Sequence, residues 1–149
     1  MQDTLISRRA FVRNGTLFMA AGSIVSEGPA FADGKPLMRF GLVTDLHHAD
    51  KAARGSRHYR ESLGKLAEAG EAFAKQAPEH VVELGDLIDS ADSLTEEKRH
   101  LREVRKKFRE LPGKKHYVLG NHCVHTLTKQ EFLGGVGREK SYYSFDEAG

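Results

Sequence analysis

Short apolar runs alternate with longer amphipathic segments along this chain. The first run covers residues 37–44 and is almost continuous in apolar and β-branched side chains. That pattern is typical of a strand that is buried on both faces of an α/β sheet. Similar runs at residues 80–84 and 115–119 predict a second and a third strand.

Two amphipathic helices are predicted between these strands. The first covers residues 56–76, where Tyr59, Leu66 and Phe73 belong to one apolar stripe whose members recur every three or four residues. Pro78 ends this helix. The second helix is expected to begin at a capping box that Ser93 forms with Glu96. Its predicted buried face consists of Leu94, Leu101, Val104, Phe108 and Leu111. The order β-α-β-α-β favours an α/β fold with a mostly parallel sheet and right-handed crossovers.

The last part of the chain predicts two smaller elements. Thr128 and Glu131 have the spacing of a capping box, so a short helical turn is expected after Thr128. Residues 141–145 are rich in aromatic side chains and predict one more strand, cut short by the end of the chain.

Composition narrows the class of protein without identifying a chemistry. A chain of 149 residues, 39% hydrophobic and 30% charged, is expected to form one compact globular domain. The formal net charge of +2 is too small to indicate binding to nucleic acid or to an anionic membrane surface. Cys123 is the single cysteine, which excludes an intramolecular disulfide.

The first residues have the order of an export signal. Arg8 and Arg9, followed by Ala10 and Phe11, resemble the twin-arginine signal that a receptor reads as an address. The mildly apolar stretch at 14–26 is shorter than the ~18 residues that a stable membrane span needs. A small-x-small site at residues 30–32 predicts cleavage there. We therefore expect a signal peptide at 1–32, a mature domain at 33–149, and a periplasmic or extracellular location. The alternative is a tail that contains two adjacent arginines by chance.

Residues that can bind metal or transfer protons follow each of the predicted strands. Asp45 and His47 end the first run, Asp86 follows the second, and Asn121 and His122 follow the third. Ligands of open α/β sheets bind beyond the carboxyl ends of the strands, so we expect these side chains to converge. A mixed oxygen and nitrogen donor set suits Mn, Fe or Zn ions. The pattern predicts a metal-dependent hydrolase with His122 as a general acid.

Two basic segments allow two interpretations each. Lys51, Arg54 and Arg57 follow the first metal motif, where they would either hold a phosphate or form a solvated loop. The second helix is rich in Lys and Arg, but its basic residues alternate with Glu97, Glu103 and other acids. A solvated face is therefore favoured there over a nucleic-acid interface.

Three motifs carry a family resemblance. Asp45-x-His47, Gly85-Asp86-x-x-Asp89 and Gly120-Asn121-His122 resemble the first three motifs of the calcineurin-like metallophosphoesterases. The resemblance implies two divalent metal ions and a phosphate-ester or diphosphate substrate. It also implies that Asp45 and His47 bind one metal, Asp86 bridges both, Asn121 binds the second, and His122 assists the leaving group.

The resemblance extends to a branch of the family and stops at the end of the chain. Residues 57–63 are similar to the manganese-dependent ADP-ribose/CDP-alcohol diphosphatases, which often have Gln in place of His47. Asp89 matches a supporting aspartate, and Cys123 stands where an acidic residue is common. The later histidine and Gly-His-x-His motifs of the family are absent. We therefore expect the N-terminal β-α-β-α-β part of a metallophosphoesterase sandwich, incomplete at its C-terminus, whose partner would be the missing C-terminal half. The alternative is a non-catalytic exported fragment that binds metal weakly or needs a partner chain.

Overall fold

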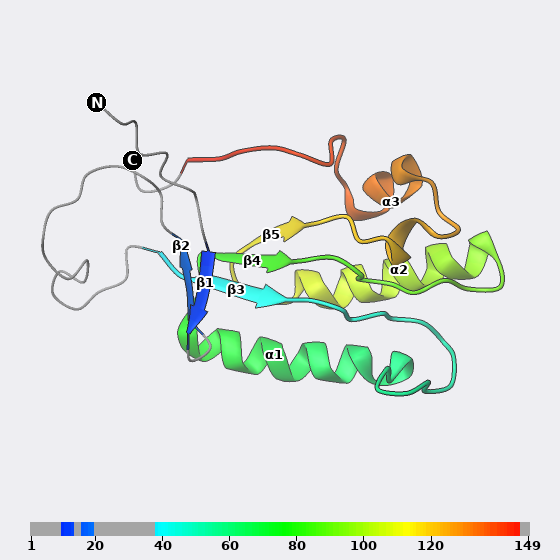
Figure 1. The fold of residues 1–149 in the computed structure, drawn as a ribbon, viewed down its shortest axis with the longest axis horizontal. Helices are drawn as coiled ribbons and strands as arrows, with labels where there is room; N and C mark the ends of the chain where they lie inside the picture. Colours follow the sequence, from blue (N-terminus) through cyan, green and yellow to red (C-terminus); the bar gives the residue numbers. More distant parts are fainter. Residues whose placement is uncertain (1–9, 14–15, 20–37, 147–149) are drawn as a thin grey trace, which may run out of the picture. The chain divides into compact units, whose positions relative to one another are not determined.

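A computed structural model describes residues 10–13, 16–19 and 38–146, and the chain divides into two compact units, Met1–Lys35 and Pro36–Gly149. In the first unit, β1 (Ala10–Arg13) pairs antiparallel with β2 (Thr16–Met19) (Figure 1). Arg8, Arg9 and the expected cleavage site lie outside the described residues. The signal peptide and its boundary therefore stay predictions. No helix in the described ranges is long and apolar enough to cross a membrane.

The second unit is built on a parallel sheet of three strands. These are β3 (Phe40–Val43), β4 (His80–Glu83) and β5 (Lys114–Tyr117), in the spatial order β3-β4-β5 (Figure 1). In the register, Val43 lies beside Glu83, and Glu83 lies beside Tyr117. The carboxyl ends of all three strands therefore meet at one edge of the sheet. The predicted α/β fold class is confirmed, with strands shorter than the apolar runs that predicted them.

Two long helices cover the same face of this sheet. A 3-10 turn, η1 (Tyr59–Glu61), leads into α1 (Ser62–Gln76), and α2 (Leu94–Arg109) follows β4. The ring of Phe73 in α1 lies so close to Gly41 that a Cβ there would be 2.9 Å from it. Phe108 in α2 packs on Tyr117, with 5.1 Å between the ring centroids. Glycine at 41 thus lets α1 approach the edge strand β3.

The helices begin and end where local chemistry provides the missing hydrogen bonds. Ala77 takes a left-handed conformation after α1, and its N–H donates to the Phe73 carbonyl before Pro78. The Ser93 hydroxyl accepts the Glu96 N–H at the start of α2, which is one half of the capping box that the spacing predicted. The first helix begins later than expected, because residues 56–58 belong to a loop and residues 59–61 to η1.

The hydrophobic core lies between the helices and the covered sheet face. Its buried members come from α1, β4, α2, η2, α3 and the loops between them: Leu66, Val81, Leu87, Ile88, Leu101, Val104, Phe108, Leu111, Cys123, Leu127, Phe132 and Val136. Leu94 was expected on the buried face of α2 but is 39% exposed. It is the first residue of the helix, where the chain arrives from solvent.

A short helix completes the described fold. After η2 (His122–Val124), the helix α3 (Lys129–Val136) packs on α2, and a Cβ on Gly135 would clash with Leu101. Thr128 and Glu131 form the complete capping box that their spacing predicted. The Glu131 carboxylate also accepts a hydrogen bond from Lys98, which is the largest cause lowering its pKa to about 2. This contact ties α3 to α2.

The second face of the sheet is open in large part, which corrects the expectation of strands buried on both faces. Phe40 and Leu42 alternate with Gly41 along β3 and are 47% and 36% exposed. Leu84 and Val118, directly after β4 and β5, are exposed as well. An apolar run shows only that both faces avoid charge. Whether a second layer covers the outer face depends on what packs there.

The expected strand at residues 141–145 is also wrong. This segment runs past β5 without joining the sheet (Figure 1). Phe145 stacks on His80 and on His116, with ring centroids 4.8 and 4.7 Å apart. The Tyr143 hydroxyl lies 2.5 Å from Nδ1 of His116. Its aromatic side chains thus pack on the sheet surface. The aromatic composition of the segment could not distinguish this packing from pairing as a strand.

Candidate metal centre

The loops after β3 and β4 are held together by their own backbones. The N–H of Asp45 donates to Gly85 O at 3.1 Å, and the N–H of His47 donates to Asp86 O at 2.8 Å. Asp45, His47 and Asp86 all have positive φ values, of 55°, 43° and 59°. Such conformations are uncommon for residues other than glycine and persist where the surrounding structure imposes them. The fold therefore strains the backbone at three of the predicted ligands.

The loop after β5 joins the same site through Asp86. The N–H of His122 donates to Oδ1 of Asp86 at 3.0 Å. Gly120 lies so close to Asp86 that a Cβ there would be 2.1 Å from its backbone nitrogen. Only glycine leaves room for this approach. The Gly-Asn-His sequence thus combines close backbone contact with two functional side chains.

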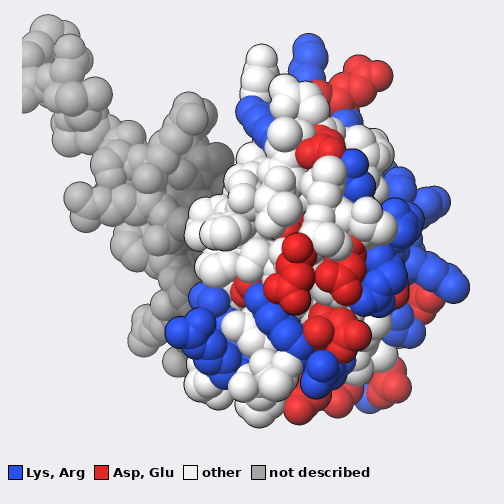
Figure 2. All heavy atoms as spheres, turned by 90° about the vertical axis from the view of Figure 1, so that its right-hand side faces the viewer, with Lys and Arg blue, Asp and Glu red and all other residues white. Residues whose placement is uncertain are grey.

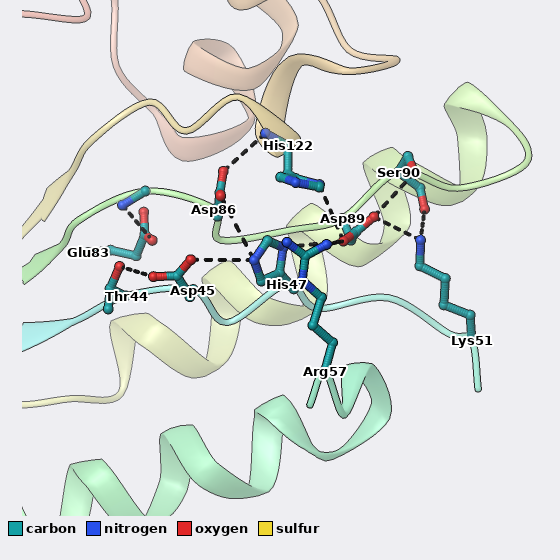
Figure 3. A network of polar contacts seen from close by, with 11 residues as sticks. Thr44, Asp45, His47, Lys51, Arg57, Glu83, Asp86, Asp89, Ser90 and His122 are labelled. Atoms are coloured by element: carbon teal, nitrogen blue, oxygen red, sulfur yellow. Dashed lines mark hydrogen bonds and ion pairs between the residues drawn. The ribbon is translucent and has the colours of Figure 1, made fainter. Parts of the chain in front are cut away.

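The predicted site residues lie together beyond the carboxyl ends of the strands. One donor atom each from His47, Asp86 and His122 lies within 4.8 Å of the other two, a group that could hold a metal ion. Nε2 of His47 is 3.5 Å from Oδ1 of Asp45 and 3.8 Å from Oδ2 of Asp86 (Figure 3). Asn121 lines a cavity of about 260 Å³ together with Asp45 and Asp86. The geometry brings all five residues to one place, and their individual roles stay predictions.

Asp89 supports this group from behind. It is buried, and its Oδ2 lies 3.2 Å from Nδ1 of His47 and 3.4 Å from Nδ1 of His122. Burial raises the pKa of Asp89, but the hydrogen bond and the charge of Lys51 outweigh it, so the pKa is lowered. An ionised Asp89 can orient both imidazole rings, as a carboxylate commonly does behind a metal-binding histidine.

The three predicted cations of the following loop have separate roles. Lys51 donates to Asp89 at 2.8 Å and to the Ser90 carbonyl at 2.9 Å, so it is committed to the protein. Arg57 lies 3.7 Å from Asp89 with its side chain 44% exposed. Arg54 exchanges two backbone hydrogen bonds with Arg57 in a tight turn. Arg57 is therefore the cation of this loop that faces the site.

Two carboxyl groups in the site have shifted pKa values of opposite sign. The Thr44 hydroxyl donates to Asp45 at 2.6 Å and is the main cause of the lowered pKa of Asp45. Burial raises the pKa of Glu83 to about 8, and the nearby charges of Asp86 and Asp45 add to it. Asp45 is therefore ionised at neutral pH, whereas Glu83 is largely protonated when no cation is near.

Glu83 and Glu97 support the site and were missed as functional candidates in the sequence. Oε1 of Glu83 accepts the Gly85 N–H at 2.9 Å, which holds the turn before Asp86. The buried Glu97 accepts the N–H of Ala91 at 3.3 Å and of Leu127 at 3.2 Å. Glu97 thus links the loop after Asp89 to the loop after η2. Both glutamates interrupt an apolar pattern, and that interruption was the available signal.

The donor set fits a divalent cation. Two imidazoles, two aspartates and an amide are oxygen and nitrogen donors without thiolate, which suits Mn, Fe or Zn. The carboxylates of Asp45 and Asp86 face the same imidazole nitrogen at distances longer than a hydrogen bond. A cation among them would offset the repulsion between these two negative charges.

Comparisons with known proteins agree with this geometry. Residues 38–148 match the family model of the calcineurin-like phosphoesterases. The chain is 27% identical over 121 residues to a manganese-dependent ADP-ribose/CDP-alcohol diphosphatase of Arabidopsis thaliana, an alignment that covers 74% of this chain and 39% of the relative. It also resembles the crystal structure of a dimetal phosphatase from Danio rerio, with a TM-score of 0.61 and 27% identity. That match covers 67% of this chain and 34% of the solved one.

The fold and the site define an α/β protein with a group of carboxylates and histidines, able to hold a metal ion, at the edge of a parallel sheet. The chain belongs to the calcineurin-like phosphoesterase family. It spans well under half the length of the two relatives.

Proposed function

We propose that this chain supplies part of a dinuclear active site that hydrolyses phosphate ester or diphosphate bonds. The cluster of His47, Asp86 and His122, with Asp45 and Asn121 beside it, is the observation that carries the proposal. Family membership supports the class of reaction. The similarity to a manganese-dependent diphosphatase favours a diphosphate bond as substrate and Mn²⁺ as the ion, with Fe and Zn as alternatives.

In this proposal the residues have separate tasks. Asp45 and His47 would hold one ion, Asn121 would hold the second, and Asp86 would contribute to binding both. Divalent ions at such a site stabilise negative charge on a phosphoryl group and lower the pKa of a bound water. Asp89 keeps the His47 and His122 rings in place, and His122 donates a proton to the leaving oxygen.

The His122 ring also lies among the groups that could hold a metal ion, so metal binding and proton donation compete at this residue. A neutral imidazole that binds metal cannot donate a proton from the same nitrogen. The His47 and His122 rings meet edge to face at 4.7 Å. Replacing His122 with Asn separates the roles: lost proton donation slows esters with poor leaving groups most, whereas lost metal binding weakens Mn²⁺ affinity for every substrate.

The decisive experiment joins metal binding to turnover. Mn²⁺ is titrated by calorimetry into the chain and into Asp86→Asn, and a panel of phosphomonoesters, phosphodiesters and diphosphates is then assayed. We expect at least a hundredfold weaker Mn²⁺ binding in the variant. Equal Mn²⁺ affinity in the two proteins would refute the proposal. Metal binding without turnover on any substrate would favour the alternative, a non-catalytic chain that binds metal or needs a partner chain.

We also propose export by the twin-arginine route to the periplasm or beyond the cell. The support is the order of the adjacent Arg8 and Arg9, the apolar stretch and the small-x-small site in the sequence. A reporter fused to the chain is expected to stay in the cytoplasm when both arginines are changed to lysine. Normal export of that variant would refute the assignment.

A further inference from the structure

A cavity of about 450 Å³ opens beside Asp45 and His47. Its walls come from three segments: the end of β3 with the following turn, residues 56–58 of the loop, and the first two turns of α1. The floor is apolar, with Val43, Leu46, Leu66 and Ala69. A volume of this size is typical of sites for small molecules and exceeds what one phosphate group fills.

Charged side chains of both signs line this cavity. Asp45 stands at the side of the metal cluster, and the other fully charged residues that line the cavity are Arg57 and Lys65. His58 also lines it, but its Nδ1 is 3.2 Å from Glu61. Among the residues that the structure describes, Lys65 makes no recorded hydrogen bond or ion pair. An anion entering from the metal side would therefore meet two cations.

Arg57 stands where the cavity meets the metal cluster. Its guanidinium lies 3.7 Å from Asp89, which itself lies 3.2 Å from His47 (Figure 3). The paired backbone hydrogen bonds with Arg54 fix the turn that carries it. A planar guanidinium in this place can bind two phosphate oxygens at once.

We propose that this cavity binds the second, non-scissile phosphate of a diphosphate substrate through Arg57 and Lys65. The inference rests on the proposed function and makes it more specific. The scissile phosphate lies at the metal cluster, and the neighbouring phosphate keeps its own negative charge that the metal site does not neutralise. Arg57 and Lys65 supply the matching positive charge, and the apolar floor accommodates the group attached to that phosphate. A monoester has no second phosphate and gains nothing from Lys65.

The test compares ligands with one and two phosphates on the full chain with excess Mn²⁺. AMP and ADP are titrated by calorimetry into the wild type, Lys65→Met and Arg57→Gln. Lys75→Met, an exposed lysine in the last turn of the same helix, and Arg54→Gln serve as matched controls. The wild type is expected to bind ADP more tightly than AMP. Each cavity variant should lower the affinity for ADP about tenfold, as expected for the loss of one charge-assisted hydrogen bond. Lys65→Met should lower the affinity for AMP less than twofold. The controls should match the wild type.

Each other outcome overturns a defined part. An unchanged ratio of ADP to AMP affinity in Lys65→Met and Arg57→Gln overturns the second-phosphate site and leaves the proposed function standing. An equal loss of AMP and ADP affinity in Lys65→Met shows a general electrostatic effect and also overturns it. A wild type that binds no Mn²⁺ overturns the proposed function and this inference together. Lys65 is exposed on α1, so its replacement leaves the core intact, which thermal unfolding verifies.

Discussion

Two pairs of histidines lie on the same sheet in different surroundings. At the carboxyl edge, His47 and His122 face Asp45, Asp86 and Asp89. On the open face, Nδ1 of His80 lies 2.8 Å from Nε2 of His116, and Phe145 stacks on both rings. Imidazoles among carboxylates form a site for a cation, whereas imidazoles among aromatic rings act as flat polar surfaces that other rings cover.

The surroundings of the two pairs also differ in how they are held. The edge site depends on strained loops, with positive φ values at three ligand candidates and a close approach of Gly120. The open-face pair projects from regular strands, one residue from β4 and one from β5. The positions of the edge residues therefore depend on loop conformations that the surrounding structure imposes. The positions of His80 and His116 depend only on the regular backbone of the strands. Changes at the edge should accordingly cost more than changes on the open face.

The largest expected effect concerns the pH dependence at the edge. Because Glu83 has a pKa of about 8 in the folded chain and an ordinary value of 4.5, the unfolded chain loses its proton first as pH rises. The free energy of unfolding therefore falls between pH 4.5 and 8, on the order of 5 kcal/mol from this group. Glu83→Gln, which keeps an acceptor for Gly85, should remove this fall.

The measurement is urea unfolding of both proteins at pH 5 and 8 in EDTA. The two proteins differ only at position 83, so the difference between their pH profiles isolates Glu83. Parallel pH profiles would contradict the buried, protonated state of this carboxyl. Added Mn²⁺ should reduce the fall in the wild type, since a cation beside Asp45 and Asp86 favours ionised Glu83.

A methyl group at position 120 should have the next largest effect. Gly120→Ala places a Cβ against the Asp86 backbone, so we expect a loss of about 3 kcal/mol in unfolding free energy and no measurable Mn²⁺ binding. Gly64→Ala is the control, because its Cβ on α1 meets no atom within 4 Å. That helix substitution should stabilise the chain by up to about 1 kcal/mol. Chemical unfolding measures the stability of both variants, and calorimetry measures their Mn²⁺ affinity. A stable Gly120→Ala variant that binds Mn²⁺ normally would refute the close approach of Gly120 to Asp86.

Loss of the Glu97 link should have a smaller effect that reaches the site. Glu97→Gln leaves one acceptor oxygen for two N–H groups, from Ala91 and Leu127. We expect about 1–3 kcal/mol lower stability and roughly tenfold weaker Mn²⁺ binding, because the loops after Asp89 and His122 loosen. Val104→Ala is the control, since it removes buried methyl groups of α2 and no hydrogen-bond acceptor. If both variants bind Mn²⁺ alike at 15 °C, where both are folded by circular dichroism, Glu97 is structural only.

The smallest effect is expected on the open face. Tyr143→Phe keeps the ring that stacks on His116 and removes the hydroxyl near Nδ1. Because Tyr143 is 43% exposed, although His116 is buried, we expect a loss of about 0.5–1 kcal/mol in unfolding free energy and unchanged Mn²⁺ affinity. A change in Mn²⁺ affinity of more than threefold would show that the two histidine groups are coupled and that their separation is wrong.

The sequence by itself determined the order of elements and the position of the chemistry. Apolar runs, Pro78 and the capping residues predicted the strands and helices, because hydrophobic period and caps are local properties of the chain. Parallel strands bring their carboxyl ends to one edge, so Asp45, Asp86 and Asn121 were expected to meet, and they line one cavity. The twin-arginine signal was inferred from local sequence too and stays a prediction.

Only the tertiary structure decided which surfaces are covered and how the site residues are aimed. It left Phe40 and Leu42 on an open face, although the pattern of β3 suited burial on both sides. It placed residues 141–145 across His80 and His116 and committed Lys51 to Asp89. It also imposed positive φ at Asp45, His47 and Asp86. Each of these outcomes depends on atoms far away in the sequence, and a local pattern of apolar and polar residues carries no information about distant partners.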